Sequence, residues 1–98
     1  ACEATYALVN QWPGGFQAEV TVKNTGSSPI NGWTVQWTLP SGQSITQLWN
    51  GDLSTSGSNV TVRNVSWNGN VPAGGSTSFG FLSSGTGQLS SSLTCTAS

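Results

Sequence analysis

The chain has 98 residues, of which 35% are hydrophobic, five are tryptophan and only 5% are charged, and its formal net charge is -1. This length and aromatic content favour one folded domain over a disordered chain, so we treat residues 1–98 as a single domain. Two basic residues are too few to neutralise a run of phosphates, which argues against nucleic acid and an anionic membrane as partners. Uncharged side chains must supply the polar surface, and they offer hydrogen bonds rather than charge.

Strands are predicted at short, regular intervals along the chain. The segment 16–24 alternates apolar and polar residues without a fault, and 33–39 repeats the pattern. The segments 60–63 and 77–81 follow, and 89–95 is a weaker closing strand. Turns rich in Gly, Pro and Ser separate these segments, and none carries a helical apolar stripe. The spacing predicts an all-β fold, an antiparallel sandwich or barrel.

The two cysteines, Cys2 and Cys95, lie at opposite ends of the chain. Two free buried thiols are an alternative, but one cysteine at each end of a small β-rich domain favours a disulfide. In the chain-entropy model such a bridge stabilises the fold by about 4 to 5 kcal/mol, and it would bring both termini together. It indicates an oxidising, extracellular setting. The sequence starts without a signal peptide, so we expect the mature form or a fragment of a secreted protein.

Two of the five tryptophans are predicted to lie in the core. Trp33 and Trp37 share strand parity with Val35 and Leu39, so one pleated face carries all four side chains. A face with four large apolar residues must be buried.

The other three tryptophans stand beside turns. Trp67 falls on the polar face when the register of the 60–63 strand is continued through it, unless a β-bulge resets the phase. Strand parity does not decide whether Trp49 is exposed, but the Asn-Gly turn beside it favours exposure. A Pro-Gly-Gly turn follows Trp12 and ends the strand there. Both Trp49 and Trp67 precede Asn-Gly, a local recurrence that is not a true internal repeat and that chance can produce.

Two of these tryptophans have an amide side chain two residues earlier on the same strand face. Asn10 precedes Trp12 and Gln47 precedes Trp49 in this way. An indole offers a flat apolar plate, and an amide offers a donor and an acceptor beside it. A pyranose ring has the complementary form, with an apolar face edged by hydroxyl groups. Three exposed indoles therefore indicate a binding surface.

The residues for common catalytic chemistry are missing from this sequence. There is no histidine, and a disulfide would occupy both cysteines, which excludes Ser-His and Cys-His nucleophiles and the usual metal ligands. Glycoside hydrolysis needs two carboxylates around one bond. Glu19 is predicted to be a solvated strand residue and Asp52 a turn residue. We expect a binding domain without metal or cofactor.

A series of short motifs extends along nearly the whole chain. In order they are Val9-Asn10-Gln11-Trp12, Val20 to Thr25, Asn31 to Val35, Thr46 to Trp49, Trp67-Asn68-Gly69 and Val71 to Gly75. In this order and spacing they resemble family 2 carbohydrate-binding modules. These bacterial domains are attached to secreted cellulases, xylanases, chitinases and oxidative polysaccharide-degrading enzymes.

The resemblance implies an immunoglobulin-like or jelly-roll sandwich of nine antiparallel strands with a flat binding face. By motif position, the coplanar tryptophans of that face are Trp12, Trp49 and Trp67, and Trp33 is the family's buried tryptophan. The amides beside the platform are Asn10 and Gln47, which the resemblance makes hydrogen-bonding partners of the ligand. Two secondary platform positions, where relatives often carry longer amides, hold Ser78 and Leu82.

The family divides into binders of crystalline cellulose and binders of xylan. In the xylan type, an arginine three residues after the first tryptophan turns that indole out of plane, and this position is Gly15 here. With Trp67 present as a third tryptophan, the resemblance implies a flat, insoluble ligand. Crystalline cellulose is the expected ligand, and chitin, whose chains have a similar face, is the alternative.

We therefore expect a secreted, monomeric, non-catalytic domain that holds an attached polysaccharide-degrading enzyme on its insoluble substrate. An immunoglobulin-like structural or protein-interaction domain is the alternative from another class. The arrangement of the indoles separates the two, because a line of coplanar rings suits a polymer chain and a cluster with a polar rim suits a protein.

Overall fold

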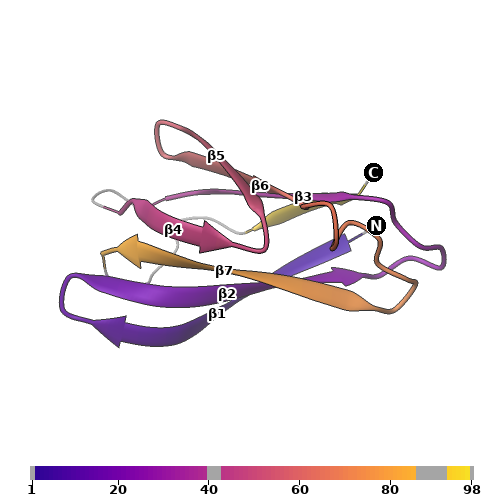
Figure 1. Ribbon diagram of the computed structural model, residues 1–98, viewed down its shortest axis with the longest axis horizontal. Coiled ribbons are helices and arrows are strands. Elements are labelled where there is room, and N and C mark those ends of the chain that lie inside the picture. The colour runs from indigo at the N-terminus through magenta and orange to yellow at the C-terminus, as the bar shows by residue number, and fades with distance from the viewer. Residues whose placement is uncertain (1, 40–42, 86–92, 98) are drawn as a thin grey trace.

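The computed structural model describes residues 2–39, 43–85 and 93–97, which form two stacked antiparallel sheets (Figure 1). We call the sheet with strand order β1-β2-β7-β4 the first sheet and the sheet with order β5-β6-β3-β8 the second sheet. The predicted all-β sandwich is confirmed. The strands are β1 (Cys2–Trp12), β2 (Gly15–Asn24), β3 (Trp33–Thr38), β4 (Ile45–Trp49), β5 (Asp52–Ser56), β6 (Asn59–Arg63), β7 (Ser76–Ser84) and β8 (Thr94–Ala97).

The described part of the chain contains eight strands, not the nine that the resemblance implies. Alternation alone does not reveal β5, because Leu53 is its only large apolar residue. Asp52, predicted to be a turn residue, is instead the first residue of β5 and pairs with Arg63 of β6. The expected closing strand at 89–95 falls partly on residues 86–92, which lie outside the described residues.

The core lies between the two sheets and includes both tryptophans predicted for it. Trp33 is 1% exposed and Trp37 is 4% exposed. The indole of Trp33 stacks on Phe79 at a ring-centroid distance of 5.6 Å, and that of Trp37 stacks on Phe81 at 5.5 Å. Since β3 belongs to one sheet and β7 to the other, these stacked rings hold the two layers together.

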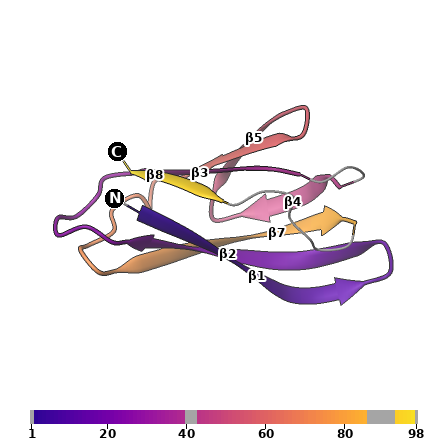
Figure 2. The ribbon, with the colours of Figure 1, turned by 180° about the vertical axis from the view of Figure 1, so that it is seen from behind.

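The predicted disulfide joins Cys2 to Cys95, with their Cα atoms 5.6 Å apart. Cys2 begins β1 in the first sheet and Cys95 lies in β8 in the second, so the bond connects the two layers. Figure 2 shows the start of β1 beside β8, with both chain ends at the same end of the sandwich.

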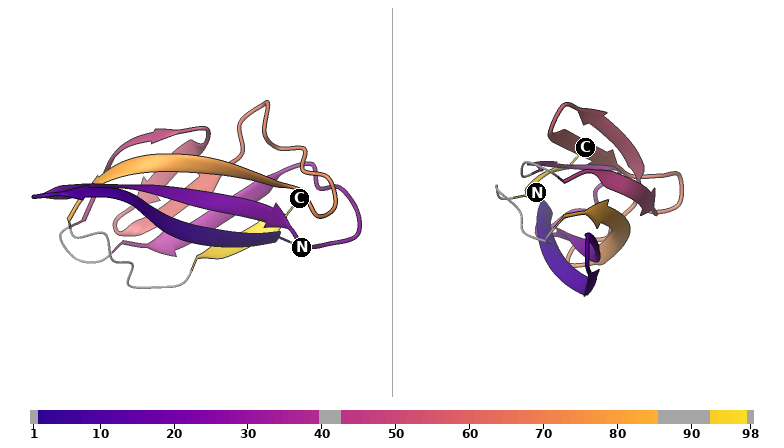
Figure 3. Two further views of the ribbon diagram at one scale, coloured as in Figure 1. Left: turned by 90° about the horizontal axis from the view of Figure 1, so that it is seen from below. Right: turned by 90° about the vertical axis from the view of Figure 1, so that its left-hand side faces the viewer.

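The Asn-Gly turn after β4 takes the chain from one sheet to the other. Asn50 has a left-handed backbone, with φ at 62°, as the turn signal predicts. The strands on either side of it, β4 and β5, do not pair, because β4 is an edge of the first sheet and β5 an edge of the second. The two layers are seen from the end in the right-hand view of Figure 3.

Candidate functional site

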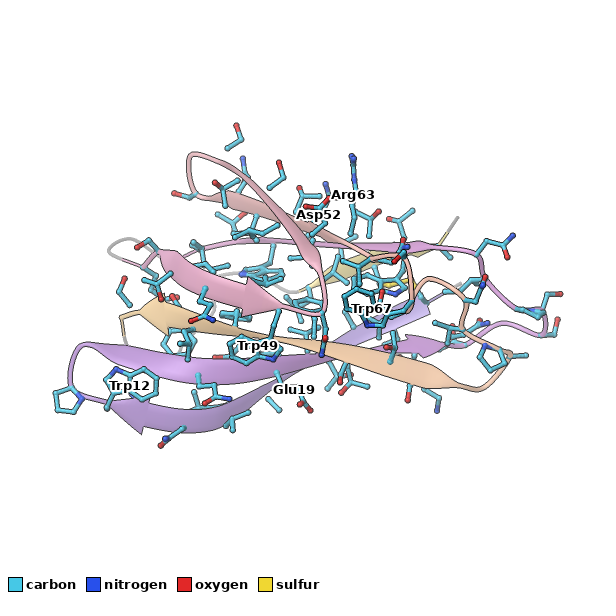
Figure 4. All side chains as sticks on the ribbon, viewed as in Figure 1. Trp12, Glu19, Trp49, Asp52, Arg63 and Trp67 are labelled. Carbon is cyan, nitrogen blue, oxygen red and sulfur yellow. A yellow bond between two sulfur atoms is a disulfide. The ribbon has the colours of Figure 1, made fainter. Side chains whose placement is uncertain are left out.

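The candidate site lies on the outward face of the first sheet. Side chains of β2 and β7 alternate between the core and this face, so Phe16 and Phe81 are buried while Gln17 and Leu82 point outward. Cross-strand pairing extends the same face to β1 and β4, the two edge strands. All three tryptophans predicted to be exposed reach this side of the molecule (Figure 4).

Trp12 and Trp49 each lie across a glycine of the neighbouring inner strand. Trp12 on β1 pairs with Gly15 on β2, and Trp49 on β4 pairs with Gly80 on β7. A Cβ atom on Gly15 would come within 2.7 Å of the Trp12 indole nitrogen, and one on Gly80 within 2.5 Å of that of Trp49. Both indoles therefore lean from an edge strand toward the middle of the sheet and lie along its surface.

Trp67 is the most exposed of the three, with 71% of its surface accessible, and Trp12 is 41% exposed. Trp49 is half-buried. The exposure of Trp67 was predicted by extending the register of β6, and that reason is wrong. Strand β6 ends at Arg63, and Trp67 lies in the turn between β6 and β7. The turn, not strand parity, directs its indole outward.

A buried asparagine fixes the turn that carries Trp67. Asn68 accepts a hydrogen bond from the main-chain N–H of Val65 over 2.8 Å and donates from Nδ2 to the main-chain oxygen of Asn50 over 2.6 Å. Its own carbonyl accepts a bond of 2.8 Å from the indole N–H of the core residue Trp33. Asn68 is only 7% exposed, and the bond from Trp33 is buried, so these bonds hold the turn against the core.

These three tryptophans, two exposed and one half-buried, form a line along the molecule, which we call the tryptophan line. Trp12 belongs to the cross-strand row of Gly15 and Ser84, Trp49 pairs with Gly80, and Trp67 shares a hollow with residues 76–78 of β7. Positions 84 and 80 are four strand residues apart, a span of about 13 Å, and the hollow beside Trp67 lies farther along β7. Figure 4 shows the labelled rings in one row along the longest axis.

A row of uncharged side chains crosses the first sheet between Trp12 and Trp49. Pairing across the four strands places three amide side chains and one leucine side by side. We call them the polar row, after the three amides: Asn10, Gln17, Leu82 and Gln47. The sequence predicted Asn10 and Gln47 as separate neighbours of two tryptophans, whereas the structure brings them into one row. It adds Gln17, whose place on the polar face of β2 was the available signal.

A hollow of about 380 Å³ lies beside Trp67 at the far end of the line. Ser78, one of the two secondary positions, belongs to it, and Leu82 belongs to the polar row instead. Within the described part of the chain, no hydrogen bond engages the side chains of Asn70 and Ser76. The hollow therefore offers free amide and hydroxyl groups. Its lining consists of Asn50, Trp67, Asn68, Asn70, Val71, Ser76, Thr77 and Ser78.

The carboxylates do not meet in a cleft. Glu3 on β1 is the cross-strand neighbour of Lys23 on β2. Glu19 is four residues from Lys23 on the same strand, so the backbone positions of the two glutamates are about 13 Å apart along the sheet. Paired glycosidase carboxylates are about 5 to 9.5 Å apart. Asp52 belongs to the second sheet. Over residues 2–39, 43–85 and 93–97, no three His, Cys, Asp or Glu side chains gather as metal ligands, and no helix could cross a membrane.

Comparison with known protein families matches residues 2–98 to the family described as "Cellulose binding domain". The chain belongs to this family. As a cellulose-binding domain it is a binding module and not a catalytic one.

Individual relatives of this cellulose-binding domain include Endoglucanase A of Thermobispora bispora, which is 97% identical over all 98 residues. The chain spans 22% of the length of that protein. Among solved structures, the chitin-binding domain of Chi18aC from Streptomyces coelicolor is similar with a TM-score of 0.80 and 41% identity, covering 95% of this chain and 90% of that one. The cellulose-binding family 2 domain from ScLPMO10C has a TM-score of 0.78 and 44% identity, covering 99% and 96%.

Proposed function

We propose that this domain binds the flat face of crystalline cellulose through Trp12, Trp49 and Trp67. The observation that carries the proposal is the tryptophan line: two indoles on the outward face of the first sheet and a third on the adjoining turn, in one row. A polymer chain repeats its sugar rings at a fixed interval, and each stacked ring removes apolar area from water on a preformed site. A crystalline surface keeps its chains straight, which suits a straight line of rings.

Hydrogen bonds from the polar row and the hollow complete the site in this proposal. Asn10 and Gln47, together with Gln17, border the path between Trp12 and Trp49 and can bond the hydroxyl groups of sugars stacked there. Ser78 adds a hydroxyl in the hollow beside Trp67, while Leu82 adds apolar contact only. Because these groups are uncharged, adsorption should depend little on salt.

In a larger protein, the domain holds an attached polysaccharide-degrading enzyme at high local concentration on its insoluble substrate. The 97% identical endoglucanase, of which this chain spans 22%, supports this role. The disulfide supports secretion, because such bonds persist outside the cell. In this proposal residues 1–98 act as one monomeric module, and the ligand is the insoluble polysaccharide.

Chitin is the second candidate ligand, favoured by the likeness to the chitin-binding domain from Streptomyces coelicolor. Chitin chains have the same backbone geometry and would stack on the same indoles. The tryptophan line argues against the protein-interaction alternative, since a protein partner would favour a compact cluster with a polar rim.

A pull-down panel tests the proposal. The 98-residue domain is mixed with microcrystalline cellulose, with crystalline chitin and with soluble xylan, and the protein left in the supernatant is measured. We expect cellulose to remove the domain from the supernatant. If chitin removes it and cellulose does not, chitin is the ligand instead of cellulose. Trp67→Ala is the matched variant and should stay in solution at concentrations where the wild-type domain adsorbs. A wild-type domain that remains in the supernatant with both solids contradicts the proposal.

A further inference from the structure

The indole of Trp49 covers Gly80 completely. A Cβ atom on Gly80 would lie 2.5 Å from Nε1, 2.6 Å from Cε2 and 2.6 Å from Cζ2 of Trp49, and these are the three nearest atoms. Gly80 is buried although it faces outward on the sheet, because the ring takes the place of solvent above it. The indole thus lies directly on the backbone of β7.

The backbone conformation does not require glycine at this position. The glycines with a left-handed backbone in the described residues are Gly14, Gly57, Gly74 and Gly85, and Gly80 is not among them. A glycine in the interior of a strand costs stability and gives up a side chain that could pack. The close approach of the Trp49 ring is the physical reason for glycine here.

The same arrangement occurs at Trp12, but Gly80 is the cleaner of the two positions. A Cβ on Gly15 would meet the main-chain oxygen of Ser83 at 3.0 Å as well as the ring of Trp12. A substitution there would disturb the strand in addition to the indole. At Gly80 every nearest atom belongs to the one side chain of interest.

We propose that Gly80 holds Trp49 flat and so makes the surface selective for a rigid, planar ligand over a flexible chain. This inference rests on the proposed function. Carbon atoms in contact are about 3.5 to 4.0 Å apart, so a methyl group on Gly80 would displace the ring by about 1 Å or more. The ring is anchored at Trp49 Cα, so the displacement tilts it out of the tryptophan line. A crystal face cannot follow this tilt, whereas a soluble chain can.

The experiment compares the wild-type domain with Gly80→Ala, Trp49→Ala and the double variant. Each is measured for adsorption to microcrystalline cellulose and for affinity toward soluble cellohexaose. We expect Gly80→Ala to weaken adsorption at least tenfold and to weaken cellohexaose binding less than threefold. Because Gly80 acts through the indole, the double variant should adsorb as Trp49→Ala does. An amide and indole N–H spectrum should show a shifted Trp49 signal on an otherwise unchanged fold.

Ala7→Val is the matched control, because Ala7 points outward in the same cross-strand row as Gly80 and bears no indole above it. It should adsorb as the wild type does. A wild-type domain that fails to adsorb overturns the proposed function itself. If the wild type adsorbs, the role of Gly80 is overturned by unchanged adsorption of Gly80→Ala, by equal loss on both ligands, or by a double variant weaker than Trp49→Ala.

Discussion

Asn68 donates a hydrogen bond of 2.6 Å from Nδ2 to the main-chain oxygen of Asn50, and this bond joins the two Trp-Asn-Gly turns of the chain. The preceding residues are Trp67 and Trp49, two members of the tryptophan line. The recurrence of the triplet, which chance alone can produce, thus corresponds to a direct contact. Because the bond is short and its donor side chain is buried, it restrains the position of one indole relative to the other.

Replacing Asn68 by alanine should loosen this connection. Asn68→Ala removes the hydrogen bonds to the N–H of Val65 and the carbonyl of Asn50, and one such bond contributes about 0.5 to 1.5 kcal/mol. We expect that loss in urea denaturation, together with weaker adsorption to cellulose. Asn68→Asp keeps the acceptor for Val65 but places a carboxylate oxygen against the carbonyl of Asn50, so it should break the connection between the turns at least as strongly. Unchanged stability and adsorption in both variants would contradict this role.

Exposed and buried tryptophans should respond to truncation in opposite ways. Trp67→Ala removes a side chain that is 71% exposed, so the free energy of unfolding should change by less than about 1 kcal/mol while adsorption falls at least tenfold. Trp33→Ala removes a buried ring and its hydrogen bond to Asn68, and should cost about 3 to 5 kcal/mol. Denaturation and adsorption measured on the same samples check both. A large loss of folding stability in Trp67→Ala would mean that the indole of Trp67 contributes to the packing of the core.

The free polar groups of the hollow should add modestly to binding. Asn70→Ala and Ser76→Ala each remove one hydrogen-bonding group beside Trp67, and one such bond contributes about 0.5 to 1.5 kcal/mol. We expect a two- to tenfold loss in the adsorption isotherm without a change in stability. Thr96→Ala, on β8 of the second sheet, is the control and should leave adsorption unchanged. Equal isotherms for all three variants would remove the hollow from the site.

Alkaline pH should destabilise the domain through Tyr6. Burial raises the pKa of the Tyr6 hydroxyl above its ordinary value of 10.0, so the folded state favours the neutral form. The stability that this group contributes is complete below about pH 10, the unfolded pKa, and is lost as the pH rises through the folded pKa. Urea denaturation at pH 9 and pH 11 should give a smaller decrease for Tyr6→Phe than for the wild type. The same decrease in both would assign the effect to other groups.

Features that depend on local periodicity could be predicted from the sequence. Alternation defined β2 and β3, parity placed Trp33 and Trp37 in the core, and the positions of the cysteines indicated the disulfide. These properties follow from the two-residue period of a strand and from residue type, both of which are visible in a single segment. Strand β5 was not predicted, because its exposed polar residues show little alternation of apolar and polar side chains.

Features that depend on pairing between distant segments could not be predicted. The glycine beneath Trp49 is 31 positions away in the sequence, and only the register of β4 with β7 brings it there. The polar row likewise draws its four members from four strands. Trp67 was predicted to be exposed, but its position depends on a turn held by Asn68, which parity cannot describe. The resemblance identified the ring residues and not the groups that support them.

The disulfide between Cys2 and Cys95 has a mechanical consequence for an adsorbed domain. Strand β1 carries Trp12 and is an edge strand, paired with β2 in the first sheet. Without the disulfide, tension on the first residue of β1 would break its hydrogen bonds to β2 one after another. The covalent bond diverts that load into β8 and the opposite sheet. Force applied at either end of the chain would then act on a cross-linked corner of the sandwich, and β1, which carries Trp12, would keep its pairing with β2.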